Sequence, residues 1–142
     1  MAKSEISPDL IASYKTADYQ AIVNTDVITL HIDQYSASLH QLLFKSDHQC
    51  AVFITAFNPL SQPQNPQKNL TRNAQLRKVL TQHTHLVFEG ASTDPSKLWP
   101  TEKSYLALGI NLKTAMTLGK QFDQNAIVWI DTDAIPRLVL LR

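Results

Sequence analysis

The sequence predicts a mixed α/β fold of the α+β type, formed by one domain that spans residues 1–142. A length of 142 residues suits a single domain. Hydrophobic residues make up 44% of the chain and charged residues 18%, which is enough for a core and argues against disorder. Short apolar runs alternate with segments of helical periodicity, and this alternation is typical of α/β proteins.

Caps, turn signals and periodicity give the order of the elements. Ser7 before Pro8 is typical of a helix start, and Asn111 indicates a second one. Three prolines between residues 58 and 69 indicate a loop. We expect a helix at 8–17, strands at 20–23 and 27–32, a helix from Ser36 or Ser38, a strand at 50–57, a helix at 67–82, strands at 85–89 and 103–108, a helix at 111–122, and strands at 126–130 and 137–141.

Residues 50–130 are expected to follow the order β-α-β-β-α-β. This is the ferredoxin-like order, with both helices on one face of a mixed or antiparallel sheet. The N-terminal helix and strands would extend that sheet, and a more parallel α/β arrangement is the alternative. In the ferredoxin-like order, four parts of the chain meet at one sheet edge together with Asn58: the start of the helix at 67–82, the loop at 91–102, the strand start with Glu102 and Ser104, and the turn at Gln124 and Asn125. The alternative interpretation of Gln124 and Asn125 is that they form an ordinary turn between a helix and a strand, with no role in a site.

The predicted helix at 67–82 carries polar residues where its apolar face should continue. Each helical residue is rotated by about 100° from the one before it, so the apolar face continues toward the N-terminus at Asn69, Arg72 and Asn73. Arg72 and the free N–H groups of the helix N-terminus suit a carboxylate or phosphate. An equally supported reading is that the three side chains tie down the proline-rich loop that starts at Asn58.

A further polar cluster lies in and after the loop at 91–102. Asp94 precedes Pro95, which indicates a turn. Trp99 is a large ring on a polar loop, where it either faces a ligand or plugs the edge of the core. Glu102 and Ser104 lie two residues apart at a strand start, so they share a face and have the groups needed for acid–base chemistry.

Composition argues against several classes of function. The net charge of +1, from 13 basic and 12 acidic residues, does not indicate nucleic acid or a membrane as a partner. The three glycines are too far apart for a dinucleotide or phosphate loop, and no metal-ligand spacing is present, so we expect neither a cofactor nor a metal. Because no segment has the pattern of a membrane span or a signal peptide, we expect a cytoplasmic protein.

A series of short motifs runs through most of the chain. In order, they are Ile54-Thr55-Ala56-Phe57-Asn58-Pro59, Asn69 with Arg72-Asn73, Gly90, Asp94, Trp99, Glu102-x-Ser104 and Phe122-x-Gln124-Asn125-Ala126. With these motifs the chain resembles a bacterial domain-of-unknown-function family, number 3293, over roughly residues 19–130. Many members have Trp where this chain has Phe57, and Gly where it has Asp123. The resemblance implies a bacterial protein and no known activity.

The leading hypothesis is a polar pocket for a small anionic or nucleotide-like ligand, with hydrolase or transferase chemistry left open. In it, Arg72 and the helix N-terminus bind the anion, Trp99 shields it, and Glu102 with Ser104 carries any catalysis. The other expected binding residues are Asn58, Asn69, Asn73, Asp94, Gln124 and Asn125.

The rival hypothesis is a non-enzymatic interaction module. The same polar residues would then only pin loops, and a sheet edge or an apolar patch would bind a partner or a second copy of the chain. This hypothesis predicts that the protein has no pocket at the polar clusters. The sequence does not decide between the two, nor does it say whether the protein is an enzyme.

Overall fold

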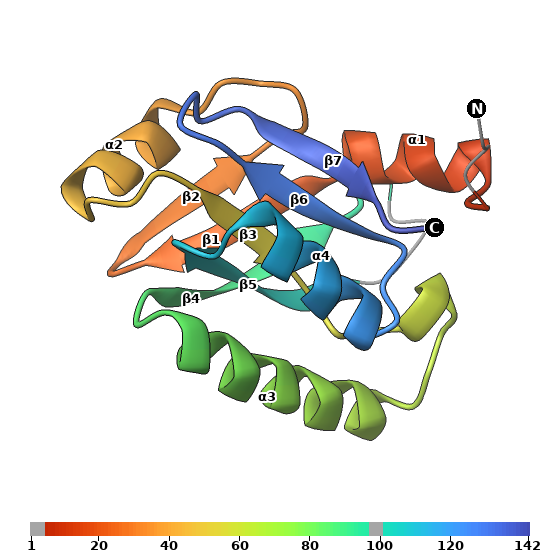
Figure 1. The fold of residues 1–142 in the computed structure, drawn as a ribbon. Coiled ribbons are helices and arrows are strands. Elements are labelled where there is room, and N and C mark those ends of the chain that lie inside the picture. The colour runs from red at the N-terminus through yellow and green to blue at the C-terminus, as the bar shows by residue number, and fades with distance from the viewer. Residues whose placement is uncertain (1–4, 97–100) are drawn as a thin grey trace.

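The computed structural model describes residues 5–96 and 101–142, where the chain forms four α-helices and one seven-stranded sheet (Figure 1). The expected mixed α/β class is confirmed. The elements are α1 (Pro8–Thr16), β1 (Asp18–Val23), β2 (Asp26–Leu30), α2 (Ala37–Lys45), β3 (Ala51–Ile54), a short 3₁₀-helix (Pro59–Ser61), α3 (Pro66–His83), β4 (Val87–Thr93), β5 (Glu102–Leu108), α4 (Leu112–Gln121), β6 (Ala126–Ile130) and β7 (Pro136–Leu140).

Every pairing in the sheet is antiparallel. The strand order is β2-β1-β4-β5-β3-β6-β7, so β2 and β7 form the edges. The more parallel arrangement considered from the sequence is therefore wrong. Strands that are distant in sequence become neighbours, and the loop after β3, the start of β5 and the turn before β6 come together at one end of the sheet.

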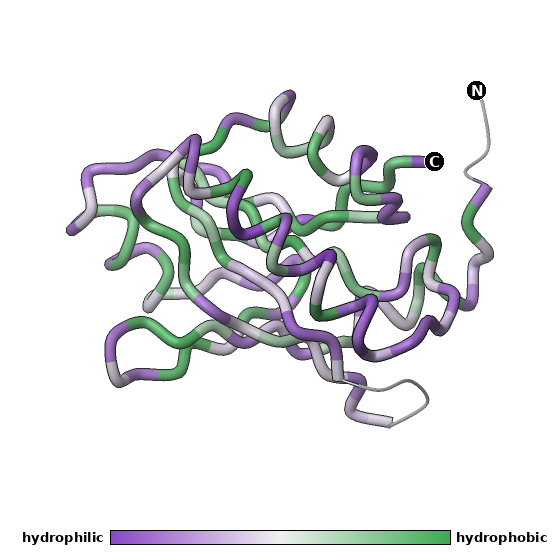
Figure 2. Tube along the Cα trace, turned by 90° about the horizontal axis from the view of Figure 1, so that it is seen from below, coloured by the Kyte–Doolittle hydropathy of each residue, from purple (hydrophilic) through white to green (hydrophobic). Residues whose placement is uncertain are grey.

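Helices cover both faces of the sheet. α3 and α4 pack on one face through residues such as Leu76, Leu80 and Leu118, and α2 packs on the opposite face through Leu39 and Leu43. Seen from the side of α3, Figure 2 shows this helix as largely hydrophilic, since only one row of its residues is buried. In the described parts of the chain, no helix combines the length and the apolar character needed to cross a bilayer.

The sheet is strongly curled. Tyr19 of β1 and Phe53 of β3 are separated by two strands, yet their rings meet edge to face with centroids 5.4 Å apart. Gly90 of β4 lies beneath this contact. A Cβ at residue 90 would lie 2.3 Å from the main-chain oxygen of Gln20 and 3.1 Å from the Phe53 ring, so the close approach requires glycine.

Most strand boundaries lie within two residues of the predictions, but two strand ends differ by more. Gly90 was expected to end a strand and a loop to start at residue 91, but β4 continues to Thr93 because its last residues pair with both β1 and β5. The strand expected to reach residue 57 stops at Ile54. Beyond it, side chains replace the sheet as hydrogen-bond acceptors: Asn73 Oδ1 accepts from the Ala56 N–H and Thr55 Oγ1 accepts from the Phe57 N–H.

Candidate ligand-binding site

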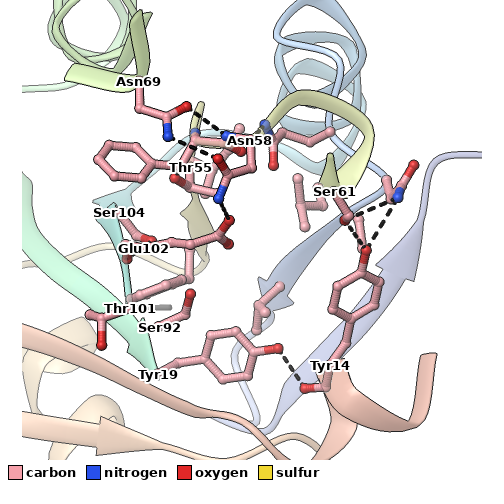
Figure 3. Close-up of a pocket in the computed structure, with 18 of the residues that line it drawn as sticks. Tyr14, Tyr19, Thr55, Asn58, Ser61, Asn69, Ser92, Thr101, Glu102 and Ser104 are labelled. Atoms are coloured by element: carbon pink, nitrogen blue, oxygen red, sulfur yellow. Dashed lines mark hydrogen bonds between the residues drawn. The ribbon is translucent and has the colours of Figure 1, made fainter. Parts of the chain in front are cut away.

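A cavity of about 390 Å³ lies at the end of the sheet where the loops converge (Figure 3). It lies on the face opposite α3 and α4, because Tyr19, Ser92 and Glu102 are register partners on that side. α1 forms one wall with Leu10 and Tyr14. The loop between β3 and α3 forms another wall.

Six of the residues expected from the sequence line this cavity: Asn58, Asn69, Glu102, Ser104, Gln124 and Asn125. Three others lie outside its lining. Asn73 is buried beneath the loop after β3, Arg72 lies against α4, and Asp94 accepts hydrogen bonds from the main-chain N–H and the hydroxyl of Ser96. Trp99 lies outside the described residues.

Glu102 provides the carboxylate of the cavity. It is half-buried at the first position of β5, and its Oε2 accepts a hydrogen bond of 2.8 Å from Asn58 Nδ2. Burial raises the pKa of Glu102 from 4.5 to about 7, and the Asn58 hydrogen bond lowers it to a smaller extent. The neighbouring Ser104 is buried and donates through Oγ to the main-chain oxygen of Glu102. At neutral pH, both protonation states of Glu102 are therefore populated.

A network of amides fixes Asn58 opposite Glu102. Asn69 Oδ1 accepts from the main-chain N–H of Asn58 at 2.8 Å and from Gln64 Nε2, and Asn69 Nδ2 donates to Asn58 Oδ1. Asn58 Oδ1 also accepts from the main-chain N–H of Gln64. With the bond from Ala56 to Asn73, these contacts tie the loop to α3, as the alternative interpretation of the sequence expected of Asn69 and Asn73. Arg72, the third residue of that interpretation, contacts Phe122 and Asp123 instead.

The loop that carries Asn58 has an unusual backbone. Asn58, Leu60 and Ser61 have φ values of 45°, 57° and 58°, in the left-handed region. Asparagine tolerates this conformation, whereas leucine and serine adopt it at a cost. The amide network and a bond of 2.6 Å from the Leu60 N–H to the Asp123 oxygen hold it in place. Strain of this kind is concentrated at functional sites.

A second polar cluster holds α1 to the body of the protein. The hydroxyls of Tyr14 and Ser61 hydrogen-bond one another, and Asn125 Nδ2 donates to both. Tyr19 donates its hydroxyl to the main-chain oxygen of Tyr14. Sequence reasoning missed Tyr14, Tyr19 and Ser61, because no local motif marks a contact that joins α1, β1 and the loop after β3.

Replacing Tyr14 with phenylalanine should loosen α1. The ring would stay, but the bonds to Ser61 and Asn125 would be lost, at a cost of about 1 kcal/mol. None of the residues of α1 is fully buried, so we expect faster amide hydrogen exchange across Pro8–Thr16. Tyr35→Phe, which changes an exposed ring, is the control and should leave exchange in α1 unchanged. Equal exchange in both variants would contradict the tethering role.

Arg72 does not occupy the position expected of it. Its guanidinium stacks on the Phe122 ring at 5.4 Å, and Nη2 lies 3.4 Å from Asp123 Oδ2. Arg142 approaches the same carboxylate at 3.8 Å. Arg72 therefore faces the end of α4 and does not line the cavity that contains Glu102, so the expectation of one anion pocket built on both residues is corrected.

Replacing Arg72 with alanine should have a small effect. The ion pair is partly exposed, so its loss should lower the free energy of unfolding by less than about 1 kcal/mol, apart from the loss of stacking on Phe122. Urea denaturation of the wild type and Arg72→Ala measures the difference. A loss of about 3 kcal/mol or more would show that Arg72 has a larger structural role than its contacts with Asp123 and Phe122 indicate.

Comparison with known proteins gives one match. Residues 54–127, more than half of the chain, match the model of the family described as "Protein of unknown function (DUF3293)". Neither the curated proteins nor the solved structures give a match. The matched segment contains all six of the expected residues that line the cavity. The chain therefore belongs to the DUF3293 family.

Proposed function

We propose that this protein binds a small organic molecule in the cavity at the end of its sheet, and that Glu102 exchanges a proton with it. The observation that carries this proposal is the position of Glu102. Among the described side chains, only Asn58 hydrogen-bonds its carboxylate, which lines a cavity of about 390 Å³. A cavity of this size suits a small ligand.

Two further observations support a reactive role for Glu102. Its pKa is raised to about 7, so it can both accept and release a proton near neutral pH. The residue that positions it, Asn58, is held by an amide network on a left-handed stretch of backbone. A rigid polar partner of this kind is what a positioned acid–base group requires.

Ligand-observed NMR and thermal-shift screening with a panel of small organic molecules test the proposal. Thr101 is exposed and lines the cavity, so Thr101→Trp should block it without disturbing the core. Thr71→Trp, on the exposed side of α3, is the matched control. We expect molecules that bind the wild type and Thr71→Trp but not Thr101→Trp. If no molecule binds, or if binding survives Thr101→Trp, the proposal is wrong.

The interaction module remains a second candidate because of one exposed surface. Ile22 and Val27 are direct cross-strand neighbours on the hairpin of β1 and β2 and are 52% and 60% exposed. β2 is an edge strand, so a second copy of the chain fits there by antiparallel pairing. Sedimentation of the wild type and of Val27→Lys tests this; a concentration-dependent dimer that Val27→Lys abolishes would support it. The interaction-module hypothesis predicted no pocket, and the cavity of about 390 Å³ is contrary to that expectation, so it favours the first proposal.

We also propose that residues 51–130 form a ferredoxin-like unit inside a single domain. Two observations support this. The four strands of this segment lie in the order β4-β5-β3-β6, and α3 and α4 pack on the same face of them. Limited proteolysis tests it: one protected fragment that contains β1 and β7 would support a single domain, and early separation of these strands from 51–130 would contradict it.

A further inference from the structure

Four aromatic residues belong to the described lining of the cavity, together with one carboxylate. Tyr14 and Tyr19 lie around it with Glu102 (Figure 3), and Phe53 and Phe57 also line it. The face of an aromatic ring carries partial negative charge and attracts cations. We propose that the ligand of this cavity is an organic cation, a compact protonated amine with an apolar body. This inference rests on the proposed function and adds the chemical class of the ligand.

The charges around the cavity favour a cation. Among the described residues that line it, none is Lys, Arg or His, and Glu102 is the only Asp or Glu. Arg72, which the sequence predicted as the anion-binding residue, contacts Asp123 and Phe122 and does not line the cavity. A carboxylate or phosphate ligand would thus meet an ionised Glu102 without a compensating positive charge, whereas an ammonium group would neutralise it.

The hydrogen-bonding groups of the cavity point to the same class of ligand. The side-chain nitrogens of all five lining amides already donate to protein acceptors, at Asn58, Gln64, Asn69, Gln124 and Asn125. The hydroxyl of Tyr19 likewise donates its hydrogen bond to the main-chain oxygen of Tyr14. The carboxylate of Glu102 keeps acceptor capacity, since a carboxylate accepts several hydrogen bonds and Asn58 provides one. Glu102 therefore offers an acceptor to a ligand that donates, while Asn58, Gln64 and Asn69 each keep one further amide N–H.

The rest of the lining defines the body of the ligand. Leu10, Phe53, Val128 and Leu138 contribute an apolar part of the cavity wall. A bare ammonium or metal ion would leave this wall in contact with water, whereas an alkyl or aryl group would cover it at about 25 cal/mol per Å². The combination selects an amine attached to a hydrophobic group of moderate size.

Binding of such a cation is linked to the protonation of Glu102. The other titratable groups that share the cavity are Tyr14 on α1 and Tyr19 on β1; the lining residues on β3, α3, β6 and β7 are not titratable. An ammonium group stabilises the ionised carboxylate, so binding lowers the pKa of Glu102 from its value of about 7 and releases a proton. The affinity for an amine is therefore expected to rise as the pH rises through 7.

Titration calorimetry with matched probes tests the inference. Benzylamine, benzyl alcohol and benzoate have similar shapes and differ in charge, and a set of alkyl amines, alcohols and carboxylates extends the comparison. At about pH 8, we expect amines to bind at least tenfold more tightly than the matched alcohols, and carboxylates to bind most weakly. At about pH 5.5, the preference for the amine should be largely lost, because Glu102 is then protonated. Near pH 7, the observed heat should differ between buffers of different ionisation enthalpy, as proton release requires.

Two variants separate the contributions. Glu102→Gln should remove the amine preference while leaving the affinity for benzyl alcohol within about twofold. Phe57→Leu keeps an apolar wall but removes a ring face, so amine affinity should fall about threefold with little change for the alcohol. Equal binding of amine and alcohol, or tighter binding of carboxylates, would overturn the cation inference and leave the binding cavity intact. Absence of binding in all three classes would overturn both.

Discussion

Replacement of Asn69 with alanine is expected to lower the free energy of unfolding by about 3 kcal/mol, since three partly buried hydrogen bonds disappear at about 1 kcal/mol each. Asn69 is only 5% exposed, and it joins Asn58 and Gln64 to α3. Without it, the main-chain N–H of Asn58 lacks its acceptor and the left-handed loop loses its main support. Urea denaturation of the two proteins measures the difference.

Gln75→Ala provides the control for this substitution. Gln75 lies on the exposed side of the same helix. Its replacement also converts an amide side chain to alanine, but it leaves the hydrogen bonds between the helix and the loop intact. We expect it to alter stability by less than about 0.5 kcal/mol. If Asn69→Ala costs no more than Gln75→Ala, the amide network does not hold the loop.

Replacement of Glu102 with glutamine should change how stability depends on pH. In the folded protein the pKa of Glu102 is about 7, compared with an ordinary value of 4.5, so between these values the folded state binds more protons than the unfolded state. The wild type should therefore lose stability as the pH rises from about 4.5 through 7, by up to about 3 kcal/mol. Glutamine cannot ionise, so the variant lacks this loss and should be the more stable protein at pH 8.

Denaturation curves at intervals between pH 4.5 and 8.5 measure this effect. Glu89→Gln, which removes an exposed carboxylate from the adjacent strand β4, is the control and should follow the pH dependence of the wild type. If the free energy of unfolding changes with pH in the same way for the wild type and Glu102→Gln, burial does not raise the pKa of Glu102. A gain in stability with a loss of amine preference would identify Glu102 as a residue retained for function at the expense of folding.

Local signals in the sequence predicted the elements well. Ser7 and Asn111 cap their helices as expected, with side chains that accept from the main-chain N–H groups of Leu10 and Thr114. Caps and periodicity act over a few residues, so they can be read without knowledge of the fold. The meeting of Asn58 and Glu102 was also expected, because it follows from the order of the elements.

Features that depend on the shape of the sheet were not predictable in this way. Gly90 was read as a strand end, yet it lies within β4 and allows β1 to approach β3. The curl of the sheet brings Tyr19 to the cavity, and no sequence pattern around residue 19 predicts this position. The sequence placed Arg72 on the same face as Asn69, but the buried row of α3 runs through Asn69, Asn73, Leu76 and Leu80, which leaves Arg72 at its margin beside α4.

Some of the residues that line the cavity lie within the segment that matches the DUF3293 model, and others lie on either side of it. Its acid and amide end, including Asn58 and Glu102, falls within residues 54–127, which match the DUF3293 model. Leu10, Tyr19 and Leu138, by contrast, belong to the flanking segments. The carboxylate and the amides that hold it therefore come from the family segment, whereas Tyr14, Tyr19 and several apolar lining residues come from the flanks. If the cavity binds a ligand as proposed, substitutions in the flanks are expected to alter the size and outline of the ligand that fits, and to leave the carboxylate in place.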